Sequence, residues 1–173
     1  MKILVTGGNG FIATNFISLA LENGHQIVSI DNLCFTDLIN HEYSSLNHNN
    51  FTFLKADIRD TDIINLIETH SFDCVLNFAA ESHVDKSIHS DKEYISTNIL
   101  STHNLLSSCH DLLKKNILPK HFKFIQVSTD EVFGSIAKGK FTEKSPYKPN
   151  SPYSASKAGG DHLVLAYFKT FNF

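Results

Sequence analysis

The stretch Lys2-Ile-Leu-Val-Thr-Gly-Gly-Asn-Gly-Phe-Ile-Ala13 decides the fold. It begins with a short apolar run, typical of a buried parallel strand, and continues into a turn with glycines at positions 7 and 10. Apolar residues then recur at helical spacing over residues 11–23. A strand, a tight turn and a helix in this order direct backbone N–H groups and a helix N-terminus toward a pyrophosphate. The stretch therefore predicts a dinucleotide site in which Gly7 and Gly10 allow close approach.

The alternation of strands and helices continues along the chain. Ser90 and Glu93 have the spacing of a capping box, which predicts one helix running to about Lys114. The last helix is predicted to begin at Pro152 with Ser151 as its N-cap. Parallel strands need crossover helices, so the predicted fold class is α/β, a doubly wound parallel sheet of Rossmann-like type. Four strands are predicted after the first, at residues 26–30, 51–54, 74–78 and 122–127.

Composition limits the functions that this chain can have. Its 173 residues suit one domain, and its formal net charge of -3, with Arg59 as the sole arginine, argues against a nucleic-acid partner. No apolar run reaches membrane length, and the histidines show no metal-binding spacing. Cys34, Cys74 and Cys109 are odd in number and widely separated, which favours a reduced, cytoplasmic protein.

Polar and small residues at the predicted strand ends suit NAD. Asp31 would accept hydrogen bonds from the adenosine ribose hydroxyls and repel a 2′-phosphate, which favours NAD over NADP. Asp57, followed by Ile58, could reach the adenine amino group, although an exposed aspartate before a helix is an equal alternative. Ala79 and Ala80 are small enough to let a cofactor lie flat at the edge of the sheet.

Two groups of residues carry candidate acid–base chemistry. Tyr153 and Lys157 are four residues apart on a predicted helix, so they share a face, and the ammonium group would favour the phenolate. Thr129, Asp130 and Glu131 directly follow the fifth predicted strand. Neighbouring carboxylates in a sheltered crevice can hold different protonation states, one acting as acid and the other as base. A surface helix pair and a charged turn are the plain alternatives.

Four stretches carry a resemblance to a known family: residues 6–12, 79–85, 128–132 and 151–157. They are similar to the NDP-glucose 4,6-dehydratases, a sugar-nucleotide branch of the extended short-chain dehydrogenases. The run from Thr129 to Glu131 is the most specific, because related epimerases and decarboxylases lack this acid–base pair.

The resemblance implies NAD-dependent dehydration of an NDP-glucose, with dTDP-glucose as the first expectation. Tyr153, tuned by Lys157, would remove the proton of the C4 hydroxyl, which Thr129 orients, while hydride passes to NAD. Glu131 would then take the C5 proton and Asp130 would protonate the departing C6 hydroxyl. Hydride return to C6 completes a net loss of water.

The resemblance also implies binding residues and a homodimer. Phe11 and Ile12 would join the cofactor site, together with Tyr153 and Lys157. In the loop after the fourth predicted strand, the expected substrate contacts are Ser82, His83 and Asp85. Family members usually dimerise through helices of this half of the molecule.

The end of the chain leaves two alternatives open. Family members continue beyond the position of Phe173 into a lobe that binds the nucleotide and closes over the sugar. Residues 1–173 are therefore expected to form one NAD-binding domain with the catalytic residues and without that lobe. One alternative is a non-catalytic NAD-binding fragment; the other is an NDP-sugar epimerase or decarboxylase.

Overall fold

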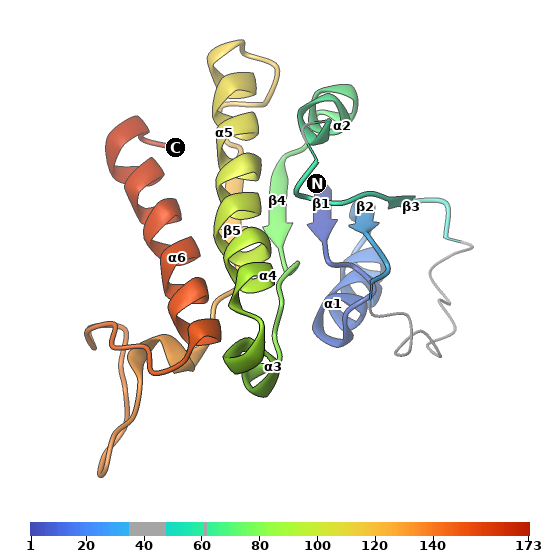
Figure 1. Cartoon of the computed structure of the whole chain (residues 1–173). Helices are drawn as coiled ribbons and strands as arrows, with labels where there is room; N and C mark the ends of the chain where they lie inside the picture. The colour runs from blue at the N-terminus through green and yellow to red at the C-terminus, as the bar shows by residue number, and fades with distance from the viewer. Residues whose placement is uncertain (35–47, 61) are drawn as a thin grey trace. The chain divides into compact units, whose positions relative to one another are not determined.

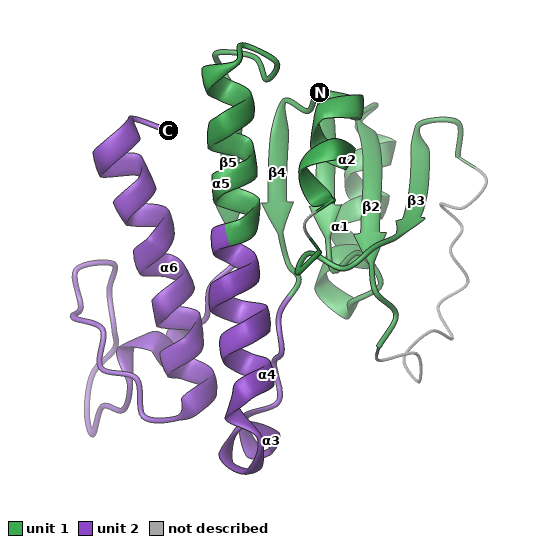
Figure 2. Cartoon of the chain, turned by 45° about the horizontal axis from the view of Figure 1, so that its top comes forward, with its two compact units in different colours: residues 1–79, 104–126 green, residues 80–103, 127–173 purple. Residues whose placement is uncertain are grey.

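The computed structural model describes residues 1–34, 48–60 and 62–173 (Figure 1). These residues divide into two compact units (Figure 2). Unit 1 comprises residues 1–79 and 104–126, and unit 2 comprises residues 80–103 and 127–173.

Unit 1 contains a parallel sheet of five strands in the order β3-β2-β1-β4-β5. The chain adds strands on one side of β1 and then crosses to the other side, so the order switches direction there. This arrangement confirms the doubly wound α/β class. The strands are β1 (Lys2–Thr6), β2 (Gln26–Asp31), β3 (Phe51–Lys55), β4 (Cys74–Asn77) and β5 (Lys123–Gln126).

Both faces of this sheet bury apolar side chains. Helix α1 (Phe11–Glu22) packs Ile17 and Leu21 into a cluster with Ile3 and Val5 of β1. Side chains alternate across a strand, so Leu4 points to the opposite face, where it is also fully buried. Burial on both faces explains why these strands read as continuous apolar runs in the sequence. Unit 1 also contains α2 (Ile63–His70) and most of α5 (Ser101–Lys114).

The helix predicted to run from Ser90 to Lys114 is interrupted. Ser90 occupies the N-cap position, but its side chain makes no capping hydrogen bond. A π-helical turn, η3, brings the Asn98 side chain inward, where it is buried and bonds both the backbone N–H and the backbone carbonyl of Glu81. Such turns insert one residue into a helix, which apolar spacing alone does not reveal. The predicted helix is thus made of α4 (Asp91–Ile95), η3 (Ser96–Leu100) and α5. A separate helix, α3 (Val84–His89), precedes Ser90.

In unit 2, α6 (Pro152–Phe171) begins where the sequence predicts. The Ser151 hydroxyl accepts a hydrogen bond from the Ser154 N–H at 3.0 Å, and the Ser154 hydroxyl accepts one from the Ser151 N–H at 3.0 Å. This reciprocal pair fixes the first turn of α6. The short 3-10 helix η4 (Asp130–Phe133) belongs to the same unit.

The described ranges hold neither a membrane-spanning helix nor a cluster of metal-binding side chains. None of the helices there has both the length and the apolar character that crossing a membrane requires. In the same ranges no three His, Cys, Asp or Glu side chains gather closely enough to hold a metal ion.

We expect Ile17→Ala to lower the free energy of unfolding by about 2–5 kcal/mol, because it leaves a cavity against a fully buried position of α1. Leu19→Ala is the matched control on the same helix, since Leu19 is 60% exposed, and should change stability by less than about 0.5 kcal/mol. Urea unfolding followed by circular dichroism measures both values. Equal losses in the two variants would contradict the packing of α1.

Candidate active site

The glycine turn after β1 passes very close to the end of β4. Gly7 has a φ of 65°, and a methyl group at this position would lie 2.7 Å from the Ala79 nitrogen. Gly10 is the N-cap of α1, and neither a side-chain cap nor an acidic residue satisfies the first turn. Within the part of the chain that the structure describes, the first N–H groups of α1 therefore have no side-chain acceptor, as a pyrophosphate site requires.

Asp31 lies beside this turn. Its Oδ2 accepts a hydrogen bond from the Asn9 N–H at 2.9 Å, and its Oδ1 accepts one from the Leu33 N–H at 2.8 Å. The Asn9 Oδ1 atom is buried and has no hydrogen-bond partner among residues 1–34, 48–60 and 62–173. An acceptor in this position suits a donor from a ligand, such as a ribose hydroxyl, so the residues present fit a dinucleotide. Phe11 and Ile12 are 70% and 63% exposed at the start of α1.

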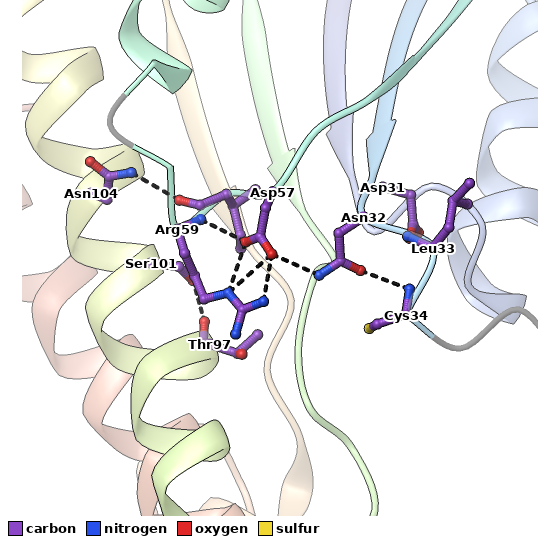
Figure 3. A network of polar contacts seen from close by, with 10 residues as sticks. Asp31, Asn32, Leu33, Cys34, Asp57, Arg59, Thr97, Ser101 and Asn104 are labelled. Carbon is purple, nitrogen blue, oxygen red and sulfur yellow. Dashed lines mark hydrogen bonds and ion pairs between the residues drawn. The ribbon is translucent and has the colours of Figure 1, made fainter.

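Asp57 is held by neighbours that the sequence did not reveal (Figure 3). Arg59 donates to both carboxylate oxygens, and Asn32 Nδ2 donates to Oδ2 at 2.9 Å. The Arg59 hydrogen bonds, opposed by partial burial and aided by Asn32, lower the pKa of Asp57 from 3.8 to about 2. An adenine amino group would have to share these oxygens with Arg59. Ile58 is buried at 5% exposure, so its side chain contributes to packing.

In unit 2, Tyr153 and Lys157 are both buried near the start of α6. The Lys157 Nζ donates a hydrogen bond to the Val127 carbonyl at 2.6 Å. Burial lowers the pKa of Lys157, and the negative charge of Asp161 partly offsets this effect.

The pKa of the Tyr153 phenol is raised. Burial is the main cause, the carboxylates of Glu131 and Asp130 add to it, and a hydrogen bond with the Thr129 side chain opposes it. This direction is opposite to the lowering expected from Lys157. The physical reason is that loss of hydration disfavours the phenolate, and two nearby carboxylates disfavour it further. The Tyr153 phenol is therefore protonated at neutral pH in the chain without ligands.

Thr129 connects the two groups of candidate catalytic residues. It is the N-cap of η4, and its Oγ1 accepts a hydrogen bond from the Glu131 N–H at 3.3 Å. The same side chain bonds Tyr153. Asp130 is exposed whereas Glu131 is partly buried, so the neighbouring carboxylates occupy different environments. The five residues predicted to be catalytic thus all lie in unit 2, with Thr129 in contact with both the turn and α6.

The predicted substrate loop also belongs to unit 2. Its residue His83 accepts a hydrogen bond at its carbonyl from the Tyr94 hydroxyl at 2.5 Å, and the Tyr94 ring meets Tyr153 edge-on with centroids 6.3 Å apart. Helices α3 and α4 pack against α6. Ser82 is exposed in the loop, and Ala80 is partly buried in this unit. Asp85 is also exposed, but it lies in the first turn of α3 and not in the loop as predicted, because the helix begins directly after His83.

Sequence reasoning missed Asn98 and Tyr94. Besides bonding Glu81, the Asn98 side chain donates to the Ser156 hydroxyl at 2.8 Å, so it links the loop after β4 to α6. Tyr94 is 2% exposed beside Tyr153. Neither residue belongs to a local motif, because their partners lie far away in the chain.

The chain matches known proteins over nearly its whole length. The family described as GDP-mannose 4,6 dehydratase matches residues 4–173. A dTDP-glucose 4,6-dehydratase of Xanthomonas campestris is 46% identical over 97% of this chain and 49% of that protein. The chain spans about half the length of the curated relatives that it matches.

Solved structures show the same likeness. A dTDP-glucose 4,6-dehydratase from Streptomyces venezuelae, solved with NAD bound, has a TM-score of 0.87 and 34% identity, covering 100% of this chain and 53% of that one. A UDP-glucuronic acid 4-epimerase from Bacillus cereus, in complex with UDP-glucuronic acid and NAD, has a TM-score of 0.86 and 31% identity, covering 100% and 54%.

We expect Arg59→Gln to raise the pKa of Asp57 from about 2 toward 3.8, because the main group that stabilises the carboxylate is lost. Carboxyl ¹³C resonances followed against pH measure the change, and Asp57→Asn assigns the signal. The lowered pKa stabilises the fold above about pH 3.8, and this contribution disappears as the pH falls through about 2. The stability deficit of Arg59→Gln should therefore shrink over that interval; a deficit independent of pH would contradict the pairing.

Proposed function

This chain belongs to the GDP-mannose 4,6 dehydratase family, and on that premise we propose that it is the NAD-binding and acid–base part of an NDP-glucose 4,6-dehydratase. One observation carries the proposal: Thr129 hydrogen-bonds Tyr153 and caps the turn that carries Asp130 and Glu131. A hydroxyl-oriented tyrosine beside two carboxylates suits a reaction that needs a base for an alcohol and an acid–base pair for elimination.

NAD is the proposed cofactor, and its binding begins at the turn after β1. The uncapped N-terminus of α1 would hold the pyrophosphate at Gly10, and Asp31 would accept the ribose hydroxyls. The other residues that we propose to contact NAD are Gly7, Phe11, Ile12, Asp57, Ile58, Ala79, Ala80, Tyr153 and Lys157. Bound NAD supplies a hydride acceptor for C4 of the sugar and returns the hydride at C6.

The acid–base steps are assigned to residues of unit 2. Tyr153 acts as its phenolate, which the buried Lys157 ammonium stabilises once bound ligands complete the site, and it becomes neutral when it takes the proton of the C4 hydroxyl. Oxidation at C4 makes the C5 proton acidic. Glu131, the less exposed carboxylate, removes that proton and returns it to C5 when hydride reaches C6, and the exposed Asp130 protonates the C6 hydroxyl as it leaves.

A nucleoside diphosphate sugar is the proposed substrate, with dTDP-glucose first. The relatives named as dTDP-glucose 4,6-dehydratases support this choice. Ser82, His83 and Asp85 are the proposed sugar contacts, because their loop is tied to Tyr153 through Tyr94. An NDP-sugar epimerase is the second candidate, favoured by the likeness to the Bacillus cereus epimerase, but it leaves Asp130 and Glu131 without a role.

We expect the purified chain to bind NAD and to convert dTDP-glucose to a product lighter by one water. Mass spectrometry after incubation with NAD and either dTDP-glucose or UDP-glucose measures the product, and calorimetry measures NAD binding in the same sample. An epimer of unchanged mass, resolved by chromatography, would favour the epimerase. Bound NAD with unchanged sugar would favour a non-catalytic NAD-binding fragment.

We expect Asp130→Asn to slow elimination by about 100-fold, because the leaving hydroxyl loses its acid, while oxidation at C4 stays largely intact. Rapid-quench analysis separates the two steps by trapping the oxidised sugar. Asp111→Asn, at an exposed position of α5, is the matched control and should leave both steps unchanged. Equal loss of oxidation and elimination in Asp130→Asn would contradict its assignment.

We also propose that the chain forms a homodimer through α6. The C-terminal half of this helix exposes Leu165, Phe168 and Phe171, each between 46% and 58% accessible. Apolar side chains gathered on one helix favour a protein partner. Light scattering should give twice the monomer mass, and Phe168→Glu should give the monomer mass; a monomeric parent chain would refute the proposal.

A further inference from the structure

We propose that Asp161 is a positioning residue for the catalytic turn, holding η4 from both sides. Its meaning for catalysis rests on the proposed function, whereas its structural role does not.

Asp161 continues the spacing of Tyr153 and Lys157 along α6. Tyr153, Lys157 and Asp161 lie at successive turns, four residues apart, so they share one side of the helix. Each makes a hydrogen bond with one of three consecutive residues that follow β5: Tyr153 with Thr129, Lys157 with the carbonyl of residue 127, and Asp161 with Ser128. Asp161 thus completes a ladder whose other two members are proposed catalytic residues.

The Asp161 carboxylate is buried and hydrogen-bonded. Asp161 is 7% exposed, and its Oδ2 accepts hydrogen bonds from the Ser128 hydroxyl and, at 3.0 Å, from the Tyr147 hydroxyl. A buried carboxylate is costly unless such donors satisfy it. Both donors come from outside α6, so burial of this carboxylate connects α6 to other segments of the chain and does not stabilise the helix itself.

The two donors precede and follow the catalytic turn along the chain. Ser128 precedes η4 directly, and Tyr147 lies on the segment that returns to it. There, the Lys148 N–H donates to the Val132 carbonyl at 2.9 Å, and the Tyr147 ring meets the Phe133 ring edge-on with centroids 5.4 Å apart. One carboxylate therefore restrains the chain before and after Asp130 and Glu131.

Asp161 also acts on Lys157 through its charge. The Asp161 charge raises the pKa of Lys157 against the larger lowering caused by burial. Without that charge the Lys157 ammonium should lose its proton at lower pH. The other titratable groups around Tyr153, Lys157 and Asp161 come from several segments: Glu81, Tyr94, Asp130, Glu131 and Tyr147.

The test compares Asp161→Asn with Tyr147→Phe in the full chain. Asparagine keeps the shape and removes the charge, whereas Tyr147→Phe removes one donor and keeps the charge. The ¹³Cε resonance of Lys157, assigned with Lys157→Arg, reports its titration. The midpoint should move to lower pH in Asp161→Asn and stay unchanged in Tyr147→Phe. Equal midpoints in Asp161→Asn and the parent chain would overturn the electrostatic role.

A second variant protects the test against a failure of Asp161→Asn to fold. Ser128→Ala removes one donor at an exposed residue and leaves the carboxylate. The amide resonances of Thr129, Asp130 and Glu131 should shift in this variant, while its unfolding midpoint in urea stays close to that of the parent chain. Unmoved resonances would overturn the positioning role.

Turnover adds a separate readout. In Asp161→Asn, kcat should fall by about tenfold or more while KM changes by less than about twofold, because misplaced acid–base groups impair chemistry more than binding. An unchanged kcat would overturn the claim that Asp161 positions the acid–base groups for catalysis. If the parent chain shows no turnover while the resonances behave as expected, the proposed function fails and the structural role of Asp161 stands.

Discussion

The parallel pairing of the five strands is the constraint on which the rest of the structure depends. Parallel strands cannot be joined by tight turns, so each must be followed by a crossover, and all their carboxyl ends meet at one edge. Polar residues at or just beyond these ends therefore lie close together at that edge, although no local sequence pattern connects them. In unit 1 the glycine turn after β1, Asp31 at the end of β2 and Asp57 after β3 are joined in this way, through Asn9 and Asn32.

Burial governs the chemistry of unit 2. Tyr153 and Lys157 are removed from water, and burial raises the pKa of the phenol while lowering that of the ammonium group. Both shifts favour the neutral forms. We expect Tyr153 and Lys157 to become charged only when a bound substrate or cofactor supplies partners for the charges, because water no longer solvates these buried groups. The Thr129 hydroxyl and the Asp161 carboxylate are the two neighbours that oppose these shifts.

The buried strands and the start of α6 were predictable because their signals lie within a few residues of one another. The apolar runs of β1 and β4 reflect burial on both faces, and Ser151 with Pro152 marks the start of α6 through chemistry confined to one turn. The π-helical turn at Asn98 was not predictable, because its side chain is drawn inward by Glu81 and Ser156, which lie 17 and 58 residues away. The expected lowering of the Tyr153 pKa was wrong in direction, since spacing along a helix says nothing about desolvation.

The sequence by itself determined the order of strands and helices, the glycine turn and the shared face of Tyr153 and Lys157, because each depends on residues within a few positions of one another. Only the tertiary structure decided that Arg59 and Asn32 share the Asp57 carboxylate and that Asp161 bonds Ser128 across 33 residues. It also decided how deeply each charged group is buried. Contacts and desolvation of this kind arise when distant segments pack together, so no local pattern of residues encodes them.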